Sequence, residues 1–595
     1  MSRETLELNT GGQFLVQPIG SPPVFSRESF TEEHREIEKM VINFAKERIY
    51  PNVLNIDKFN KELTLRLMKE IGELGLLGAD IPEEYGGMNL DKITSAIVME
   101  GLCRGGSASF GVTSSVQTSI GSMGIVWFGT KEQKEKFLPD LVTGEKIASY
   151  ALTEPSAGSD ATSGKTTAIL SEDGKYYILN GEKIFITNGG WSDVFTVLVQ
   201  VDGDKFSGIL VEKGTEGFEI GAEEKKMGMK GSSTTSLKFT DCKVPVENLL
   251  YEVGKGTDIA FNALNIGRYK LAASCLGGAK TCIEETIKYI NERRQFGQAI
   301  ANFDAIRGKV ADMTIRIYCC DSMTYRTIGL IQNAIDELDP AAEDYYIQMG
   351  KAMGKYAIEV SMAKIYGSDT SDEIIDTGLQ CFGGYGFIEE YPMAMAYRDD
   401  RINSIWEGTN EINRMIITGF LMKKALMDEL DVRAALDGLD DFLNDPENSF
   451  ALNSLQDEAR AIEAGKRLAL LIFNEAICEF GQDLKHLQQL GDLLADAFTL
   501  LYAGEATICR VNNATAGNGQ SLIPPMIAQV NTIEACQEII TKLQTAIRYL
   551  FPSGATVDLV EKIKKLESAM NLDTDTISLK QEIAHFMVKQ TSYPF

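Results

Sequence analysis

The sequence predicts a mainly α fold with a central β domain, because apolar residues follow helical spacing towards both ends of the chain and strand spacing between them. Helical spacing covers residues 27–145 and returns from residue 256, whereas short β-branched and aromatic runs occupy residues 146–255. A chain of 595 residues is also long enough for several domains. We therefore expect four domains, over residues 27–145, 146–255, 256–424 and 425–595.

The N-terminal helices follow a polar leader that contains Pro18, Pro22 and Pro23. The first helix is expected to begin near Thr31 and to end at Pro51, because proline is not tolerated in a helix interior. A second helix follows it. Their apolar faces repeat every three or four residues, at Ile37, Val41 and Phe44 and then at Leu67, Ile71 and Leu74.

The β domain is expected to contain a hairpin whose turn is Asn180–Gly181, a dipeptide typical of tight turns between strands. Residues 176–179 and 183–187 would be the two strands of this hairpin. Further strands are expected at Val194–Val201, Gly208–Glu212 and Leu237–Val244.

From Asp258 helices are expected to run to about Lys424, and one long helix should end near Arg293. Beyond them the acidic stretch Asp437–Asn448 predicts a linker, followed by a mostly helical tail. The buried face of the tail is marked by Leu487, Leu490, Leu494, Phe498 and Leu501.

Composition limits the possible partners and compartments. The net charge of −27 and the pI near 4.7 argue against nucleic acid or an anionic membrane surface as a general partner. Ten cysteines without a CxxC pair argue against a metal site or a disulfide framework. The N-terminus lacks a basic start followed by an apolar core, and no run of about 18 apolar residues occurs. We therefore expect no signal peptide, no membrane span and a cytoplasmic location.

Histidine is too scarce to supply a base in most of the chain, since only His34, His486 and His585 are present. A carboxylate is the alternative, and Glu407 lies in the segment INSIWEGTNEINRM, between Trp406 and Gly408. A carboxylate beside a glycine turn and a helix start can reach over a bound ligand as a general base. The pattern Ser404-x-x-Glu407 also fits a capping box, which is the plainer interpretation of the motif alone.

Four further segments carry small or aromatic residues in loops and at strand or helix ends. They are YALTEPSAGSD (Tyr150–Asp160), KIFITNGG (Lys183–Gly190), RRQFG (Arg293–Gly297) and QCFGGYGF (Gln380–Phe387). Taken singly, the first three could be a β-turn loop, a half-buried strand and a solvated helix end, whereas the glycines of the fourth indicate a backbone that packs against something flat or charged. Small side chains also let backbone N–H groups approach an anion or a polar ring edge.

In this order, and with WEGTNEI downstream, the segments closely resemble the acyl-CoA dehydrogenase family over residues 27–424. The resemblance implies an N-terminal helical domain, a β-barrel-like middle domain and a C-terminal four-helix bundle, with FAD bound between them and across a subunit interface. The additional helical domain, residues 425–595, is similar in placement to the tail of the very-long-chain subgroup. That similarity implies a homodimer.

The resemblance also implies residues that bind the cofactor. Thr153 is expected at the pyrimidine side of the flavin and Thr187 at its N5, while Phe185 stands where the family usually has a stacking Trp. The flavin contacts fall on Tyr150, Leu152, Thr153, Gly158, Ser159, Phe185, Ile186, Thr187, Thr409 and Glu411. The adenosine and pyrophosphate contacts, partly in the neighbouring subunit, fall on Arg293, Phe296, Gln380, Gly383 and Gly384. Asp304 departs from the Gln that touches adenine in many members.

For the substrate, the resemblance implies Glu407 as the catalytic base. A subgroup that carries its base in an LExR sequence is excluded here, because Gly267 occupies the place of the acid in Leu264–Arg268. The expected substrate contacts are Ser159, Asn265, Arg268, Trp406 and Gly408, together with Gly121 and Gly124.

Gly121 and Gly124 bear on how long an acyl chain the pocket can hold. Ser114–Val126 aligns with the helix that floors the acyl pocket in this family. Gly121 and Gly124 are three residues apart and should share one face of that helix, where two absent side chains would open a slot for a long chain. Close packing of two helices at these glycines is the alternative.

The implied reaction is the α,β-dehydrogenation of an acyl-CoA to a trans-2-enoyl-CoA, the first step of fatty-acid β-oxidation, with electrons passed to an electron-transfer flavoprotein. Two alternatives stay open at this point. One is an acyl-CoA oxidase that uses dioxygen, and the other is an assembly or scaffold protein that keeps the fold.

Overall fold

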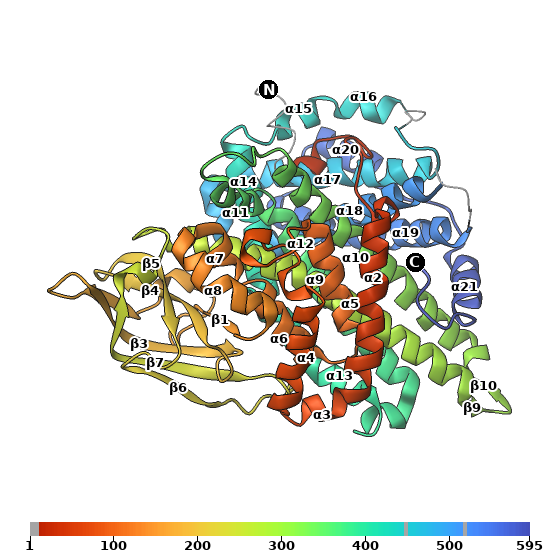
Figure 1. Cartoon of the computed structure of the whole chain (residues 1–595). Coiled ribbons are helices and arrows are strands. Elements are labelled where there is room, and N and C mark those ends of the chain that lie inside the picture. Colours follow the sequence, from red (N-terminus) through yellow and green to blue (C-terminus); the bar gives the residue numbers. More distant parts are fainter. Residues whose placement is uncertain (1–10, 446–449, 516–520) are drawn as a thin grey trace.

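The computed structural model describes residues 11–445, 450–515 and 521–595 (Figure 1). The extreme N-terminus and residues 446–448 of the acidic stretch therefore lie outside the described residues. Helices make up most of the molecule, and one β domain lies to one side of them (Figure 1). The predicted fold class, mainly α with a central β domain and an added helical tail, is confirmed.

Seven described helices precede the β domain and form the N-terminal domain. They are α2 (Glu32–Phe44), α3 (Val53–Asp57), α4 (Lys61–Glu73), α5 (Lys92–Cys103), α6 (Ala108–Thr118), α7 (Met123–Phe128) and α8 (Lys131–Thr143). Helix α2 begins where the sequence predicts, with Thr31 as its N-cap. It ends at Phe44, where a π-helical turn follows.

The prediction of one helix over Ser114–Val126 is wrong. The chain leaves α6 at Ser119, whose φ is −128° and ψ −101°, and α7 begins only at Met123. Gly121 lies in the intervening turn and donates a backbone hydrogen bond to Val116 O at 2.9 Å. A Cβ at Gly121 would lie 2.8 Å from that oxygen and 3.0 Å from Cβ of Ala148, so only glycine fits the turn. Gly121 and Gly124 therefore do not share one helix face.

The middle domain is an eight-stranded sheet with the strand order β6-β7-β3-β2-β4-β5-β8, and β1 pairs with β4 in parallel. Its strands are β1 (Ala148–Ala151), β2 (Thr167–Leu170), β3 (Tyr176–Thr187), β4 (Val194–Val201), β5 (Lys205–Glu212), β6 (Phe218–Glu223), β7 (Thr234–Pro245) and β8 (Leu249–Leu250). Strands β1 and β3 end beside the helical domains and carry two of the predicted cofactor segments.

The predicted hairpin turn at Asn180–Gly181 is also wrong, because both residues lie inside the single twelve-residue strand β3. The pairing of β3 with β7 shifts between Leu179 and Gly181, which marks a β-bulge. Gly181 has φ of 149°, and a Cβ there would lie 2.6 Å from Oγ1 of Thr166. The glycine thus serves close packing of two strands rather than a reversal of the chain.

The helical bundle that follows surrounds the long helix α9, which ends at Glu292, next to the predicted Arg293. A short hairpin of β9 (Arg294–Gln295) and β10 (Gln298–Ala299) extends beyond it (Figure 1). The helices of the bundle are α9 (Gly256–Glu292), α10 (Asp304–Asp336), α11 (Tyr345–Lys355), α12 (Ala357–Phe382), α13 (Pro392–Asp400) and α14 (Asn410–Leu426).

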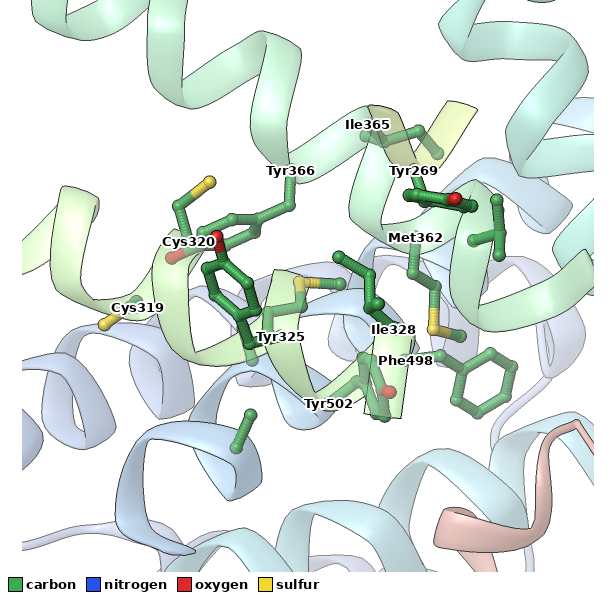
Figure 2. Packing of buried hydrophobic residues seen from close by; sticks show 14 of the residues in the cluster. Tyr269, Cys319, Cys320, Tyr325, Ile328, Met362, Ile365, Tyr366, Phe498 and Tyr502 are labelled. Carbon is green, nitrogen blue, oxygen red and sulfur yellow. The ribbon is translucent and has the colours of Figure 1, made fainter. Parts of the chain in front are cut away.

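The tail forms α15 (Val432–Asp437), α16 (Leu439–Asn444), α17 (Gln456–Phe480), α18 (Gln488–Thr515), α19 (Ile523–Leu550), α20 (Val557–Met570) and α21 (Thr576–Met587). The expected linker at Asp437–Asn448 is thus partly helical, because Leu439 and Phe442 of α16 are buried. Figure 2 shows Phe498 and Tyr502 of α18 beside Ile328 of α10. The tail and the bundle therefore share one hydrophobic core.

A buried ion network fastens the leader and the tail to the bundle. Arg27 of the leader lies 2.9 Å from Asp321 of α10, and Lys280 of α9 lies 2.7 Å from Glu100 of α5. Arg510 of tail helix α18 reaches Asp321 at 3.3 Å. Such a network is strongly destabilised when one member is removed, so the tail belongs to the cooperative fold. Within the described ranges, no helix is long and apolar enough to cross a membrane.

Candidate active site

A cavity of about 1740 Å³ lies where the β domain, α6, α9 and the start of α14 meet. Helix α9 contributes to its wall from Phe261 to Glu285, a span of about 36 Å at the usual rise of a helix. The cavity brings together predicted residues that are far apart in sequence: Tyr150, Leu152, Thr153, Gly158, Ser159, Phe185, Ile186, Thr187, Asn265, Arg268, Trp406, Glu407, Gly408 and Thr409.

Glu407 stands in a turn with an unusual backbone. Its φ is 56°, and that of Gly408 is 82°, so two consecutive residues adopt the left-handed region. A non-glycine residue in this conformation is uncommon, and such residues are enriched at active sites. Thr409 then caps α14, because its hydroxyl accepts the Ile412 N–H at 3.2 Å. Ser404 is not the N-cap of this helix, so the capping-box interpretation of Ser404 and Glu407 is wrong.

Two neighbours on α9 hold the Glu407 turn. Arg268 Nε donates to the Glu407 backbone oxygen at 3.0 Å, and its Nη1 donates to Asn265 Oδ1 at 3.0 Å. Gly267 lies directly beneath the carboxyl group, because a Cβ built on it would be 2.6 Å from Glu407 Oε2. The Glu407 turn is therefore held through its backbone oxygen, and the carboxyl group packs against the backbone of α9 at Gly267.

The surroundings of Glu407 favour its neutral carboxyl group more than water does, and its pKa is therefore raised towards neutrality. Its Oε2 is inaccessible to solvent and has no hydrogen-bond partner among the described residues. Burial raises the pKa of Glu407 to about 7, although Arg268 and Lys364 both act in the opposite direction. Such a pKa suits a general base at neutral pH.

Lys364 is a member of the site that the sequence analysis missed. It lies on α12, is completely buried, and donates from Nζ to Asn410 Oδ1 at 2.7 Å. Burial lowers its pKa to about 8, while Cys275 and Glu407 act to raise it. A lone lysine inside the apolar run VSMAKIYG was the available signal. Buried lysines are rare unless they are paired or functional.

The opposite wall of the cavity is built by β1 and β3. Tyr150 and Leu152 come from the end of β1 and the loop after it, and Phe185 of β3 has φ of 58° with 62% of its surface exposed. A buried ion pair joins the two segments: Lys183 Nζ lies 2.6 Å from Glu154 Oε1 and 3.0 Å from Leu152 O. The pair fixes a flat apolar surface next to the hydroxyl-bearing residues Thr153 and Thr187.

The predicted adenosine and pyrophosphate residues lie apart from this cavity. Arg293, Gly383 and Gly384 line a second cavity of about 450 Å³, and Gln380 is exposed near it. Phe296, at the tip of the β9–β10 hairpin, has 92% of its surface exposed. Asp304, which replaces the Gln of many family members, accepts a hydrogen bond from Gln581 of tail helix α21 at 3.0 Å.

Three other predicted residues do not line the cavity among the described residues. Glu411 is exposed on the first turn of α14. Gly121 packs against Ala148, and a Cβ on Gly124 would meet Ile259 and Leu250 at ordinary contact distances. The alternative, close packing of two helices at both glycines, is wrong for Gly121, which packs in a turn against strand β1, while Gly124 faces Ile259 of α9 without a close approach. Between α6 and α7 only Ile120 reaches the cavity.

Family models match most of the first three domains. They are the acyl-CoA dehydrogenase N-terminal domain over residues 31–145, the middle domain over residues 149–242 and the C-terminal domain over residues 254–422.

The chain is similar to a probable acyl-CoA dehydrogenase of Bacillus subtilis, with 44% identity over 523 residues and 87% of each chain covered. It is 35% identical over 444 residues to the human mitochondrial very long-chain specific acyl-CoA dehydrogenase, covering 73% of this chain and 63% of that one. Among solved structures it is similar to an acyl-CoA dehydrogenase complexed with FAD from Bacillus anthracis. The TM-score is 0.93 at 39% identity, covering 98% of this chain and 100% of that one.

Proposed function

The chain belongs to the acyl-CoA dehydrogenase family and is an FAD-dependent oxidoreductase, and on that premise we propose that it oxidises long-chain acyl-CoA thioesters to trans-2-enoyl-CoA with Glu407 as the base. The observation that carries this proposal is the Glu407 carboxyl group. It is buried, lies in the cavity, and has a pKa raised to about 7.

Glu407 accepts the α-proton of the thioester. That proton is too weakly acidic for a carboxylate in water, so the enolate charge must be stabilised as it forms. The Glu407 N–H donates no hydrogen bond to any other described residue, which leaves it available to the thioester oxygen. Arg268 holds the other side of the turn, because its hydrogen bond to the Glu407 oxygen fixes the Glu407–Gly408 peptide.

The residues on the opposite wall fit a flavin. Tyr150, Leu152 and Phe185 offer apolar surface for a flat ring, and Thr153 and Thr187 offer hydroxyl groups for its polar edge. Gly158 and Ser159 lie in the loop after β1 and line the same cavity. When bound, FAD supplies the acceptor for the hydride that leaves the β-carbon. We assign the adenosine end to Arg293, Phe296, Gln380, Gly383 and Gly384 of a neighbouring subunit.

The length and lining of the cavity support a long acyl chain. Val112 and Val116 of α6 form a small apolar cluster with Met229, and Ile402 and Trp406 pack against it. Each methylene that is buried there contributes about 0.8 kcal/mol to binding. A wall that runs about 36 Å along α9 can accommodate both an extended chain and the pantetheine arm.

We propose an electron-transfer flavoprotein as the electron acceptor, fatty-acid β-oxidation as the pathway and a homodimer as the assembly. The dimer is supported by the tail, which packs on the bundle through α18 and leaves the hairpin with Phe296 free to reach a second copy. Sedimentation of the holoenzyme tests the assembly, and a stable tetramer would overturn it.

The test of the function is anaerobic reduction of the bound flavin by acyl-CoA thioesters from four to twenty carbons, a range of about sixteen methylenes. Bleaching is expected with an optimum among the long chains, whereas an optimum at butyryl- or hexanoyl-CoA would reject the long-chain assignment. Peroxide formation under air that outpaces reduction of an electron-transfer flavoprotein would indicate an oxidase. Absence of bleaching by any acyl-CoA would leave the scaffold alternative.

A further inference from the structure

Lys364 lies behind the catalytic turn rather than in the cavity wall. Its Nζ is on the bundle side of the turn, in contact with Asn410, the first residue of α14. Asn410 in turn donates from Nδ2 to Ser368 Oγ at 3.0 Å and to Asp369 Oδ1 at 2.9 Å. One lysine and one asparagine therefore tie α12 to the start of α14, three residues after Glu407.

The hydrogen bonding of Lys364 is unusual for a buried ammonium group. Its one hydrogen-bond partner among the described residues is the neutral amide oxygen of Asn410, whereas Lys183 and Lys280 each contact a carboxylate directly. A buried charge without a direct counterion is expensive unless nearby charges compensate for it. The carboxylates that face Lys364 include Glu407 of the catalytic turn and Asp369 of its own helix.

The other titratable neighbours are few. Cys275 and Arg268 of α9 face Lys364 from one side, and Glu411 of α14 faces it from the other. Glu407 itself faces Arg268, Lys364 and the phenol of Tyr150. The guanidinium of Arg268 already donates to the Glu407 oxygen and to Asn265, so Lys364 is a second cation acting on the same turn.

We propose that Lys364 is a positioning residue of the active site: its ammonium group, held by Asn410, anchors α14 behind the catalytic turn and favours the carboxylate form of Glu407. The inference rests on the proposed role of Glu407. Physically, a neighbouring cation stabilises the carboxylate over the carboxylic acid, and its removal favours the acid.

Three variants at this position separate charge from packing. Lys364→Met removes the charge and the donor, Lys364→Gln removes the charge but keeps a donor for Asn410, and Lys364→Arg keeps both. Each holoenzyme is mixed with a long-chain acyl-CoA without oxygen, and the rate of flavin bleaching is recorded from about pH 6 to pH 9.5. The matched control is Lys270→Met, since Lys270 is also buried and donates to one neutral oxygen, Thr118 O, at 2.7 Å.

We expect the midpoint of the rate to rise by about one pH unit in Lys364→Met and Lys364→Gln. That rise corresponds to a bleaching rate about tenfold below wild type at the acid end of the pH range and equal to wild type at the alkaline end. Lys364→Arg and Lys270→Met should keep the wild-type midpoint. The inference is overturned if both neutral variants bind FAD and keep that midpoint. It is also overturned if neither neutral variant yields holoenzyme, because Lys364 would then act only in folding. Failure of the wild-type protein to bleach with any acyl-CoA would instead reject the proposed function.

Discussion

The carboxyl group of Glu407 packs against the backbone of Gly267, and a Cβ at Gly267 would lie 2.6 Å from Oε2 and 2.9 Å from Oε1. A side chain at position 267 and the carboxyl group of Glu407 therefore compete for the same space. This relationship explains in steric terms why a base placed at 267 and a base placed at 407 are alternatives, and why glycine accompanies Glu407 here.

Gly267→Ala should displace the Glu407 carboxyl group while favouring the helix itself. Alanine gains about 1 kcal/mol of helix propensity over glycine, but its methyl group cannot fit beneath the carboxyl group. We expect a loss of about 10²-fold in the rate of flavin reduction, because misplacement by about 1 Å can cost that much. FAD content should be unchanged.

The matched control is Gly308→Ala, since a Cβ at Gly308 of α10 meets nothing within 4 Å. It should retain the wild-type rate. Equal rates for Gly267→Ala and wild type would show that the contact with Glu407 has no catalytic consequence.

Arg268→Lys should lower turnover without loss of FAD. Arginine makes two hydrogen bonds here, to the Glu407 oxygen and to Asn265 Oδ1, in a fixed fork that lysine cannot reproduce. Steady-state kinetics should show a fall of about tenfold to a hundredfold in kcat/KM. A variant as fast as wild type would mean that the charge alone, and not the fork, supports the turn.

The reaction should lose rate as the pH falls below neutrality. Burial raises the pKa of Glu407 to about 7, and only the carboxylate can accept the α-proton. The rate of flavin reduction should therefore fall about tenfold per pH unit below pH 7 and level off above it. A rate that stays constant down to pH 5 would contradict a base with a raised pKa.

Asp321→Asn should destabilise the whole chain. Burial opposes ionisation of Asp321, but Arg27, Lys280 and Arg510 outweigh it and hold its pKa well below the ordinary value. Because the pKa is depressed, the stabilisation is present above the ordinary pKa of aspartate and is lost as the pH falls below it. Denaturant unfolding at pH 7 should show a loss of about 3–5 kcal/mol.

The corresponding change at an exposed carboxylate of the tail, Asp573→Asn, should stay within about 0.5 kcal/mol of wild type. If the tail unfolded separately in Asp321→Asn, in a transition of its own, the proposed unity of tail and bundle would fail.

Regular elements with a clear period were predictable from the sequence. Strand Val194–Val201 matches β4, and the long helix ends one residue before Arg293, because burial on one face imposes those periods. The errors arose where a glycine serves a tertiary contact. Asn180–Gly181 signals a turn locally, but the approach of Thr166 makes it a bulge. Ser114–Val126 has helical composition, but the helix ends at Ser119, and the close approach of the Val116 carbonyl and the Ala148 side chain requires glycine in the turn at Gly121.

Site residues were predictable from the sequence where several of them lie in one short segment. The neighbours Trp406, Glu407 and Gly408 arrive at the cavity together because they are adjacent in sequence. Lys364 could not be placed in this way, since it reaches Asn410 only through the packing of α12 against α14. The apolar run VSMAKIYG signals that Lys364 is buried, but no local pattern identifies the residue that a buried lysine contacts.

The central claim is that Glu407 removes the α-proton, and Glu407→Gln tests it most directly. Glutamine keeps the size of the side chain and the backbone hydrogen bond from Arg268, but it cannot accept the proton at neutral pH. Rapid mixing of the FAD-loaded variant with a long-chain acyl-CoA without oxygen should show normal binding and a rate of flavin reduction at least about 10³-fold below wild type. Flavin reduction by Glu407→Gln at a near-normal rate, with full FAD content, would contradict the assignment.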